Sequence, residues 1–294
     1  MIGTGPYDSL REYLEAIEKY GKLIRIDEID QDAYELTGFM YKLMDKHGWL
    51  GAPAVIVEKV KIDGEWVEGP ILINQYGMSG HEALAIGVPL EDIDWGDHVL
   101  DYSTSVNKMM DRVPIEPMKA IEVDAANAPS KEVILKEDEI DVLSFPFIQT
   151  NPADNGRFIN TGNLITVDPD GVRNVGTYRM QIKGPRKIGI SPEKNQDGWK
   201  AIMAHKENGE THAKVAVVLG TDPIVFAMSS SKTARSGQDE LEIAGGFKGK
   251  PVEVVKCENS DIMVPANVEM IIEGEIPLDD FEEEGPFGEM YGYM

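Results

Sequence analysis

The middle of the chain reads Asn163-Leu-Ile-Thr-Val-Asp168, then Asp170-Gly171, then Gly176-Thr-Tyr-Arg-Met-Gln-Ile182. β-Branched and aromatic residues favour strands, and an Asp-Gly pair between two such runs favours a tight hairpin turn. The sequence therefore predicts two antiparallel strands joined by a short turn.

The region around this hairpin alternates short apolar runs with turn residues. Strands are predicted over residues 214–219, 223–226, 251–257 and 268–273, whereas a helical pattern appears only over residues 197–206 and 239–245. Many short strands with few helices are typical of a β-barrel or a β-sandwich. The change of texture near Lys119 predicts a β-rich domain over residues 119–294.

The first third of the chain mixes helices and strands. Four apolar residues recur at helical spacing within residues 8–20: Leu10, Tyr13, Leu14 and Ile17. Further helices are predicted over residues 32–47, 80–87 and 97–112, and strands over residues 22–27, 54–60 and 66–73. Asp63-Gly64 between the last two strands predicts a hairpin. The expected fold class is α+β, with an N-terminal α+β domain over residues 1–118.

The composition limits the classes of partner. A formal net charge of −24 argues against nucleic acid and anionic membrane surfaces, both of which attract Lys and Arg. Cys257 is the only cysteine, so an intrachain disulfide is excluded. The opening residues do not resemble a secretory signal, and apolar runs stay short of the roughly 20 residues that a membrane span needs. These features predict a cytoplasmic protein.

Two carboxylates flank a stiff turn in Glu284-Gly-Pro-Phe-Gly-Glu289. Glycine and proline fix the backbone there, so both carboxylates can face one point, where repulsion and desolvation raise one pKa and allow acid/base chemistry. From the residues alone, a solvated acidic turn that continues from Glu282 and Glu283 is the simpler interpretation.

The run from Asn174 to Arg179 places an amide and a guanidinium on one predicted strand. Residues five apart on a strand point to opposite faces. A site that uses both side chains needs a bend, and Gly176 is the residue expected to supply it.

These segments together resemble the UbiD family of prenylated-FMN-dependent (de)carboxylases. The resemblance rests on Asp154-Asn-Gly-Arg-Phe-Ile-Asn-Thr-Gly-Asn163, the 174–179 run, residues 254–265, Glu273-Gly-Glu-Ile276, and Glu284-Gly-Pro-Phe-Gly-Glu-Met-Tyr-Gly-Tyr293, in the family's order. It implies that the second domain is a split β-barrel of the flavin-reductase kind that holds prenylated FMN. It also implies decarboxylation or carboxylation of an aromatic or α,β-unsaturated acid through a covalent flavin adduct.

Site residues follow from the same resemblance. Arg179, Glu284 and Glu289 match the family's catalytic positions, with Arg179 orienting the substrate carboxylate and Glu289 as the proton shuttle. The matched flavin contacts are Asn174, Thr177, Tyr178, Arg179, Gln196, Ser230, Ser231, Lys232 and Glu240.

The family's divalent metal, manganese with a nearby potassium ion, is held by an Asn, a His and a Glu. Asn174 and Glu240 match the first and third ligands, whereas Asp197 stands where many members have histidine. Carboxylate oxygen is a sound ligand for Mn²⁺ or Mg²⁺, and Asp197 also adds a negative charge beside the flavin phosphate.

Length is a second departure from the family pattern. Members continue past the 284–289 turn into a C-terminal domain that helps to close the site and to form oligomers. The 294 residues here predict either a shortened form or one subunit of a split enzyme, whose partners include a second subunit and a flavin prenyltransferase that supplies the cofactor. Two alternatives stay open, a non-catalytic scaffold subunit and a plain FMN-binding oxidoreductase. The sequence does not specify the acid or the net direction.

Overall fold

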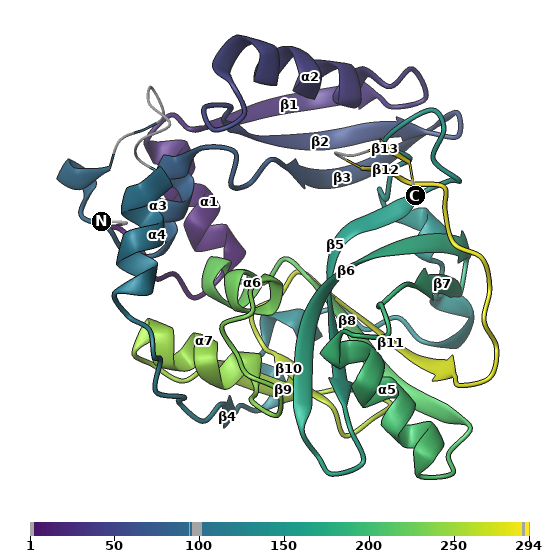
Figure 1. Ribbon diagram of the computed structural model, residues 1–294. Coiled ribbons are helices and arrows are strands. Elements are labelled where there is room, and N and C mark those ends of the chain that lie inside the picture. The colour runs from purple at the N-terminus through teal and green to yellow at the C-terminus, as the bar shows by residue number, and fades with distance from the viewer. Residues whose placement is uncertain (1–2, 94, 96–101, 290–291, 294) are drawn as a thin grey trace.

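A computed structural model describes residues 3–93, 95, 102–289 and 292–293 (Figure 1). The N-terminal part contains α1 (Leu10–Lys19), β1 (Leu23–Asp30), α2 (Glu35–His47), β2 (Ala54–Ile62), β3 (Glu65–Ile73), α3 (Ser79–Ala85) and α4 (Tyr102–Met110). Strand β2 pairs in parallel with β1 and antiparallel with β3, so the predicted Asp63-Gly64 hairpin is confirmed. Helix α2 covers one face of this small sheet (Figure 1), and no helix in the described part of the chain is long and apolar enough to cross a membrane.

A five-stranded sheet in the order β11-β8-β5-β6-β7 forms the centre of the second part. Its strands are β5 (Phe158–Val167), β6 (Arg173–Gly184), β7 (Lys187–Ile190), β8 (His212–Leu219) and β11 (Met270–Pro277). Every neighbouring pair is antiparallel, and β5 and β6 are the two strands predicted from the central hairpin. The sheet curls into a half-barrel (Figure 1). Together with the helices around it, this sheet confirms the predicted α+β class.

Smaller elements surround this sheet. They are β4 (Ile121–Glu122), β9 (Glu253–Lys256) and β10 (Met263–Pro265) in one sheet, the hairpin β12 (Gly288–Glu289) and β13 (Gly292–Tyr293), and helices α5 (Asp197–Glu207), α6 (Pro223–Ser230) and α7 (Glu240–Lys248). Single 3₁₀ turns span Leu90–Asp92, Ala125–Asn127, Pro129–Lys131, Glu137–Glu139 and Val142–Ser144.

The predicted strand over residues 223–226 is wrong, because these residues begin helix α6. Asp222 caps the helix by accepting hydrogen bonds from the backbone N–H groups of Ile224 (2.9 Å) and Val225 (3.0 Å), and Pro223 occupies the first turn. A short apolar run fits a buried helix as well as a buried strand, and the Asp-Pro start distinguishes the two here.

One hydrophobic core joins the two parts of the chain. Tyr13 and Ile17 of α1 lie in the same buried cluster as Val225 and Met228 of α6. Helix α1 forms because Ser9 caps it, accepting from the N–H of Glu12 at 3.1 Å, and because its apolar residues recur on one face. The division at residue 118 stays a prediction, because both sides of it contribute to this core.

His205 fastens helix α5 to the large sheet. Its Nε2 lies 2.7 Å from the Val167 carbonyl and its Nδ1 lies 3.0 Å from the Glu210 carboxylate. Desolvation lowers the pKa of His205, but these two acceptors outweigh it and the pKa is raised above 6.5. A doubly protonated ring therefore fits this position best.

We expect this contact to make stability depend on pH. A histidine whose pKa is raised by folding stabilises the fold fully below pH 6.5, and that contribution is lost as the pH rises through the folded-state pKa. His205→Gln should lower the free energy of unfolding by about 1 kcal/mol in acid and by less in base. Urea titrations at several pH values measure this, with the exposed His212→Gln as the control. An equal loss at every pH would contradict the expectation.

Candidate active site

Arg179 and Glu284 form the central ion pair of the site. Arg179 Nε lies 3.1 Å from Glu284 Oε1, and Nη2 lies 3.3 Å from Oε2. Both side chains are largely buried, with 18% and 12% of their surface exposed. Phe287 packs beneath the guanidinium at 5.2 Å and against the Phe158 ring at 4.7 Å. The pair is thus partly shielded from water. This shielding strengthens the charge-assisted hydrogen bonds between the two side chains.

Glu289 closes the same turn, 284–289. Its backbone lies in β12, opposite Gly292 of β13, while its side chain lies outside the described residues. Gly285 adopts a φ of +89°, a conformation that glycine adopts without strain.

Glu240 lies beside the backbone of Asn174 and Val175. Its Oε2 accepts a hydrogen bond from the Val175 N–H at 2.7 Å. Desolvation raises the pKa of Glu240 to about 7, its backbone hydrogen bonds oppose the shift, and the carboxylates of Asp239 and Asp197 add to it. Two of the three predicted metal ligands, Asp197 and Glu240, are therefore close enough to interact electrostatically.

Asn174, the third predicted ligand, has a buried Nδ2 with no hydrogen-bond partner. Rotating the amide to present Oδ1 at this position would break no hydrogen bond of Nδ2. Within the described ranges, three His, Cys, Asp or Glu side chains do not gather anywhere as a metal-ligand group. The candidate set of one amide and two carboxylates has only oxygen ligands, which suits a hard divalent cation.

The irregularity of the strand pair does not lie at Gly176. The register of β5 with β6 is regular through Gly176 and shifts between Ile159 and Gly162, across from Arg179. Gly176 makes room for an aromatic ring instead, because a side chain there would begin 2.5 Å from the Tyr178 ring. One at Gly198 would begin 2.6 Å from Tyr178 Oη. Tyr178 therefore packs between its own strand and the first turn of α5.

Thr177 joins a hydroxyl cluster. Its Oγ1 accepts from Asn163 Nδ2 at 2.8 Å and lies 2.8 Å from Ser230 Oγ. Asn163 also donates to Ser229 Oγ at 2.7 Å and accepts from Thr221 Oγ1 at 3.0 Å. The sequence reasoning missed Asn163, Ser229 and Thr221, although an asparagine within an apolar strand is a signal for a buried polar contact.

Three predicted flavin contacts do not share the hydrogen bonds of this cluster. Gln196 Oε1 accepts from the Glu193 N–H at 2.7 Å, so its side chain folds back on its own loop. Ser231 Oγ lies 2.8 Å from Thr233 Oγ1, and Lys232 is exposed. Asp197 is half exposed and pairs with Lys200 at 2.7 Å.

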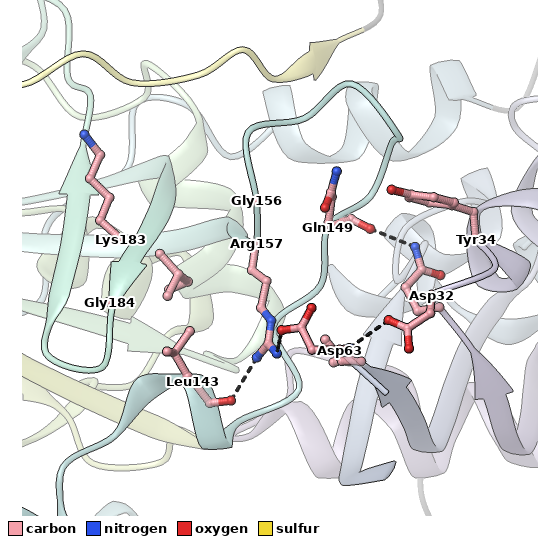
Figure 2. A pocket seen from close by; sticks show the side chains of 12 residues that line it. Asp32, Tyr34, Asp63, Leu143, Gln149, Gly156, Arg157, Lys183 and Gly184 are labelled. Atoms are coloured by element: carbon pink, nitrogen blue, oxygen red, sulfur yellow. Dashed lines mark hydrogen bonds and ion pairs between the residues drawn. The ribbon is translucent and has the colours of Figure 1, made fainter. Parts of the chain in front are cut away.

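Two cavities in the described part of the chain are not lined by Arg179 or Glu284. One of about 380 Å³ lies where the small sheet meets the half-barrel, lined by Asp63, Gln149 and Arg157 among others (Figure 2). The other, of about 240 Å³, is mostly apolar and reaches Ser230, and burial raises the pKa of Glu82 in its wall. The candidate site is therefore assigned from side-chain chemistry and not from cavity size.

Comparison with known proteins identifies the family. Residues 121–294, more than half of the chain, match the model for the 3-octaprenyl-4-hydroxybenzoate carboxy-lyase Rift-related domain, UbiD. The chain belongs to the UbiD family. The resemblance found from the sequence is thereby confirmed.

Relatives and solved structures agree over nearly the whole UbiD chain. It is 31% identical over 297 residues to a phenolic acid decarboxylase of Bacillus subtilis, covering 98% of this chain and 58% of the relative. It is similar to an evolved dimeric form of the UbiD-class enzyme HmfF from Pelotomaculum thermopropionicum in complex with prFMN, with 33% identity, a TM-score of 0.81, and coverage of 98% and 62%. Against the vanillic acid decarboxylase of Sedimentibacter hydroxybenzoicus in its open form, the identity is 26%, the TM-score 0.82, and the coverage 99% and 59%. The UbiD chain thus spans somewhat over half the length of the proteins that it matches.

Proposed function

We propose that this UbiD chain is the flavin-binding, catalytic part of a prenylated-FMN-dependent carboxy-lyase that acts on an aromatic or α,β-unsaturated acid. The observation that supports it most is the shielded ion pair between Arg179 of β6 and Glu284 of the 284–289 turn. The names of the decarboxylase relatives support the class of reaction.

The reaction requires an electron sink, because loss of CO₂ leaves an electron pair on carbon. Prenylated FMN supplies that sink when it is bound. Arg179 donates to Glu284 through Nε and Nη2, which orients the guanidinium for a charge-assisted contact with the substrate carboxylate. Glu289 delivers the proton that replaces CO₂ and removes it in the reverse direction.

The chain's own residues fit a flavin phosphate with a divalent cation. Asn174, Asp197 and Glu240 provide oxygen ligands, and a cation would stabilise the ionised form of the desolvated Glu240. Hydroxyl groups of Thr177 and Ser230 supply donors close by. Manganese or magnesium, with potassium beside it, is the set that we propose.

Flavin binding is expected to require the divalent cation. FMN titrated into the metal-free protein should bind weakly, and adding Mn²⁺ should strengthen binding by at least about tenfold. Glu240→Gln should remove the effect of Mn²⁺, because the amide has no charge to bind the cation. Glu242→Gln, on the same turn of α7, is the matched control. Equal affinity in EDTA and in Mn²⁺ would exclude the metal role.

This chain matches only 58–62% of the length of its relatives. We expect turnover to need a segment equivalent to the rest of those proteins, either on the same chain or on a second subunit. An oligomer and a flavin prenyltransferase that supplies the cofactor belong to the same proposal.

Two alternative functions predict different behaviour. A plain oxidoreductase on this fold has no use for the Arg179–Glu284 pair. A scaffold subunit would lack turnover in every assembly.

The test uses protein made in cells that contain a flavin prenyltransferase. Phenolic, heteroaromatic and acrylic acids are incubated with the flavin-loaded complex, and CO₂ release and the decarboxylated product are measured. Turnover of at least one acid class is expected. A loaded complex that leaves all of them unchanged would reject the enzyme in favour of the scaffold.

A further inference from the structure

The 284–289 turn is held from outside by a buried carboxylate. Asp154 Oδ1 accepts a hydrogen bond from the Gly288 N–H at 2.7 Å, and its Oδ2 accepts one from the Asn151 N–H, also at 2.7 Å. Only 5% of Asp154 is exposed. An ionised carboxyl group satisfies both N–H donors without rearrangement, because all of its lone pairs are acceptors.

A second buried side chain holds the other end of the turn. Gln181 lies two residues after Arg179, so the two side chains share one face of β6. Its Oε1 accepts from the Gly285 N–H at 3.2 Å, and its Nε2 donates to the Asn155 carbonyl at 2.5 Å. The Asn155 N–H in turn donates to the Pro286 carbonyl at 2.8 Å. The turn is therefore fixed at positions 285, 286 and 288.

Gly288 lies close to the side chains of Asn151 and Asp154. A side chain at Gly288 would begin 2.6 Å from Asn151 Nδ2 and 3.3 Å from Asp154 Oδ1. A larger residue at this position would require the Asn151 amide to shift. Movement of the turn away from Asp154 would lose the hydrogen bond at the Gly288 N–H.

The segment that bears Asp154 is itself anchored. Gln149 Nε2 donates to the carbonyls of Asn151 (3.1 Å) and Asp154 (2.9 Å). The Gln149 carbonyl accepts from Nε2 of Gln31, a side chain of the N-terminal part, at 2.8 Å. Figure 2 shows Gln149 and Arg157 on this segment, with Arg157 reaching Asp63 and the Leu143 carbonyl. Asp154 is thus held in place from both parts of the chain.

We propose that Asp154 is a positioning residue for decarboxylation, because it fixes the backbone of the 284–289 turn and thereby holds Glu284 beside Arg179. This inference rests on the proposed function, because it assigns the turn a catalytic role. Asp154 makes its contact through the Gly288 backbone and takes no proton from the substrate. Displacement of a catalytic group by about 1 Å can cost roughly 10²-fold in rate, so a loosened turn should lower kcat.

The first test compares Asp154→Asn with Asp168→Asn in the flavin-loaded, competent complex. The amide of asparagine can accept from only one of the two N–H groups and presents a donor to the other. Asp168 is the matched control, since its Oδ1 accepts from the N–H groups of Asp170 (3.0 Å) and Val172 (2.8 Å) in the hairpin turn. We expect Asp154→Asn to lower kcat by roughly 10²-fold with KM and flavin affinity unchanged. Asp168→Asn should leave kcat at the wild-type value.

Hydrogen exchange provides a readout that does not depend on turnover. In Asp154→Asn the Gly288 amide should exchange at least about tenfold faster than in the wild type, while amides of the large sheet keep their protection. A protected Gly288 amide, or a wild-type kcat, in Asp154→Asn would overturn the inference. A wild-type complex that fails to turn over would instead reject the proposed function, and the exchange measurement would still report whether Asp154 holds the turn.

A rescue experiment covers the case in which Asp154→Asn fails to fold. Gly288→Ala places a methyl group 2.6 Å from Asn151 Nδ2, and kcat should fall to the extent that the turn is displaced by it. The side chain of Asn151 is the closest obstacle, and Asn151→Ala combined with Gly288→Ala should recover much of the loss. Recovery supports positioning by steric fit at this contact. A double variant as slow as Gly288→Ala would overturn it.

Discussion

Replacing Glu289 by glutamine is expected to lower net decarboxylation by roughly 10²–10⁴-fold while flavin stays bound. Glutamine keeps the shape and much of the hydrogen bonding of the carboxyl group but cannot deliver a proton. The measurement is deuterium incorporation into the product in heavy water, in the complex that turns over.

Glu284→Gln is the matched comparison for Glu289→Gln, because it changes a carboxylate at the other end of the same turn. It should weaken the hold on Arg179 but leave proton delivery in place. If Glu289→Gln incorporates deuterium at the wild-type rate, Glu289 is not the shuttle, and Glu284 becomes the candidate for that role.

Arg179→Ala is expected to reduce both substrate binding and turnover, with kcat/KM lower by at least about 10²-fold. The substitution removes the guanidinium proposed to bind the substrate carboxylate, and it removes the ion-pair partner of Glu284, which is 12% exposed. An unpartnered buried carboxylate should also cost about 1–3 kcal/mol of unfolding free energy. Steady-state kinetics and urea unfolding measure the two losses separately.

Arg179→Lys distinguishes charge from geometry. Lysine keeps the positive charge but lacks the planar pair of donors, so most of the kinetic loss should remain. Arg11→Ala is the control for loss of a bidentate pair, since Arg11 binds Glu269 at 2.9 and 2.7 Å on the surface, where such pairs contribute little. Full activity in Arg179→Lys would contradict a role for the planar guanidinium.

The sequence was enough to predict most of the sheet. The β5–β6 hairpin follows from side-chain type and an Asp-Gly turn, both of which are local signals. Helix α6 was missed because its apolar run has no polar face to reveal a helical period. Strand β11 was placed at residues 268–273 but spans Met270–Pro277, since pairing with β8 sets its ends.

The candidate site was predictable only in part. The Arg179–Glu284 pair came from the resemblance, because nothing local joins residues 105 positions apart. Asp154 and Gln181 carry no local signal of their contact with the turn, which depends on tertiary packing. The predicted bend at Gly176 was wrong, because the glycine leaves room for the ring of Tyr178 two residues away.

The packing of Tyr178 between Gly176 and Gly198 separates two properties of helix α5. The approach of the helix to β6 is limited at Gly198 by the Tyr178 hydroxyl, whereas Asp197, at the first position of the helix, is half exposed. A substitution at position 197 should therefore leave the packing of α5 against Tyr178 unchanged.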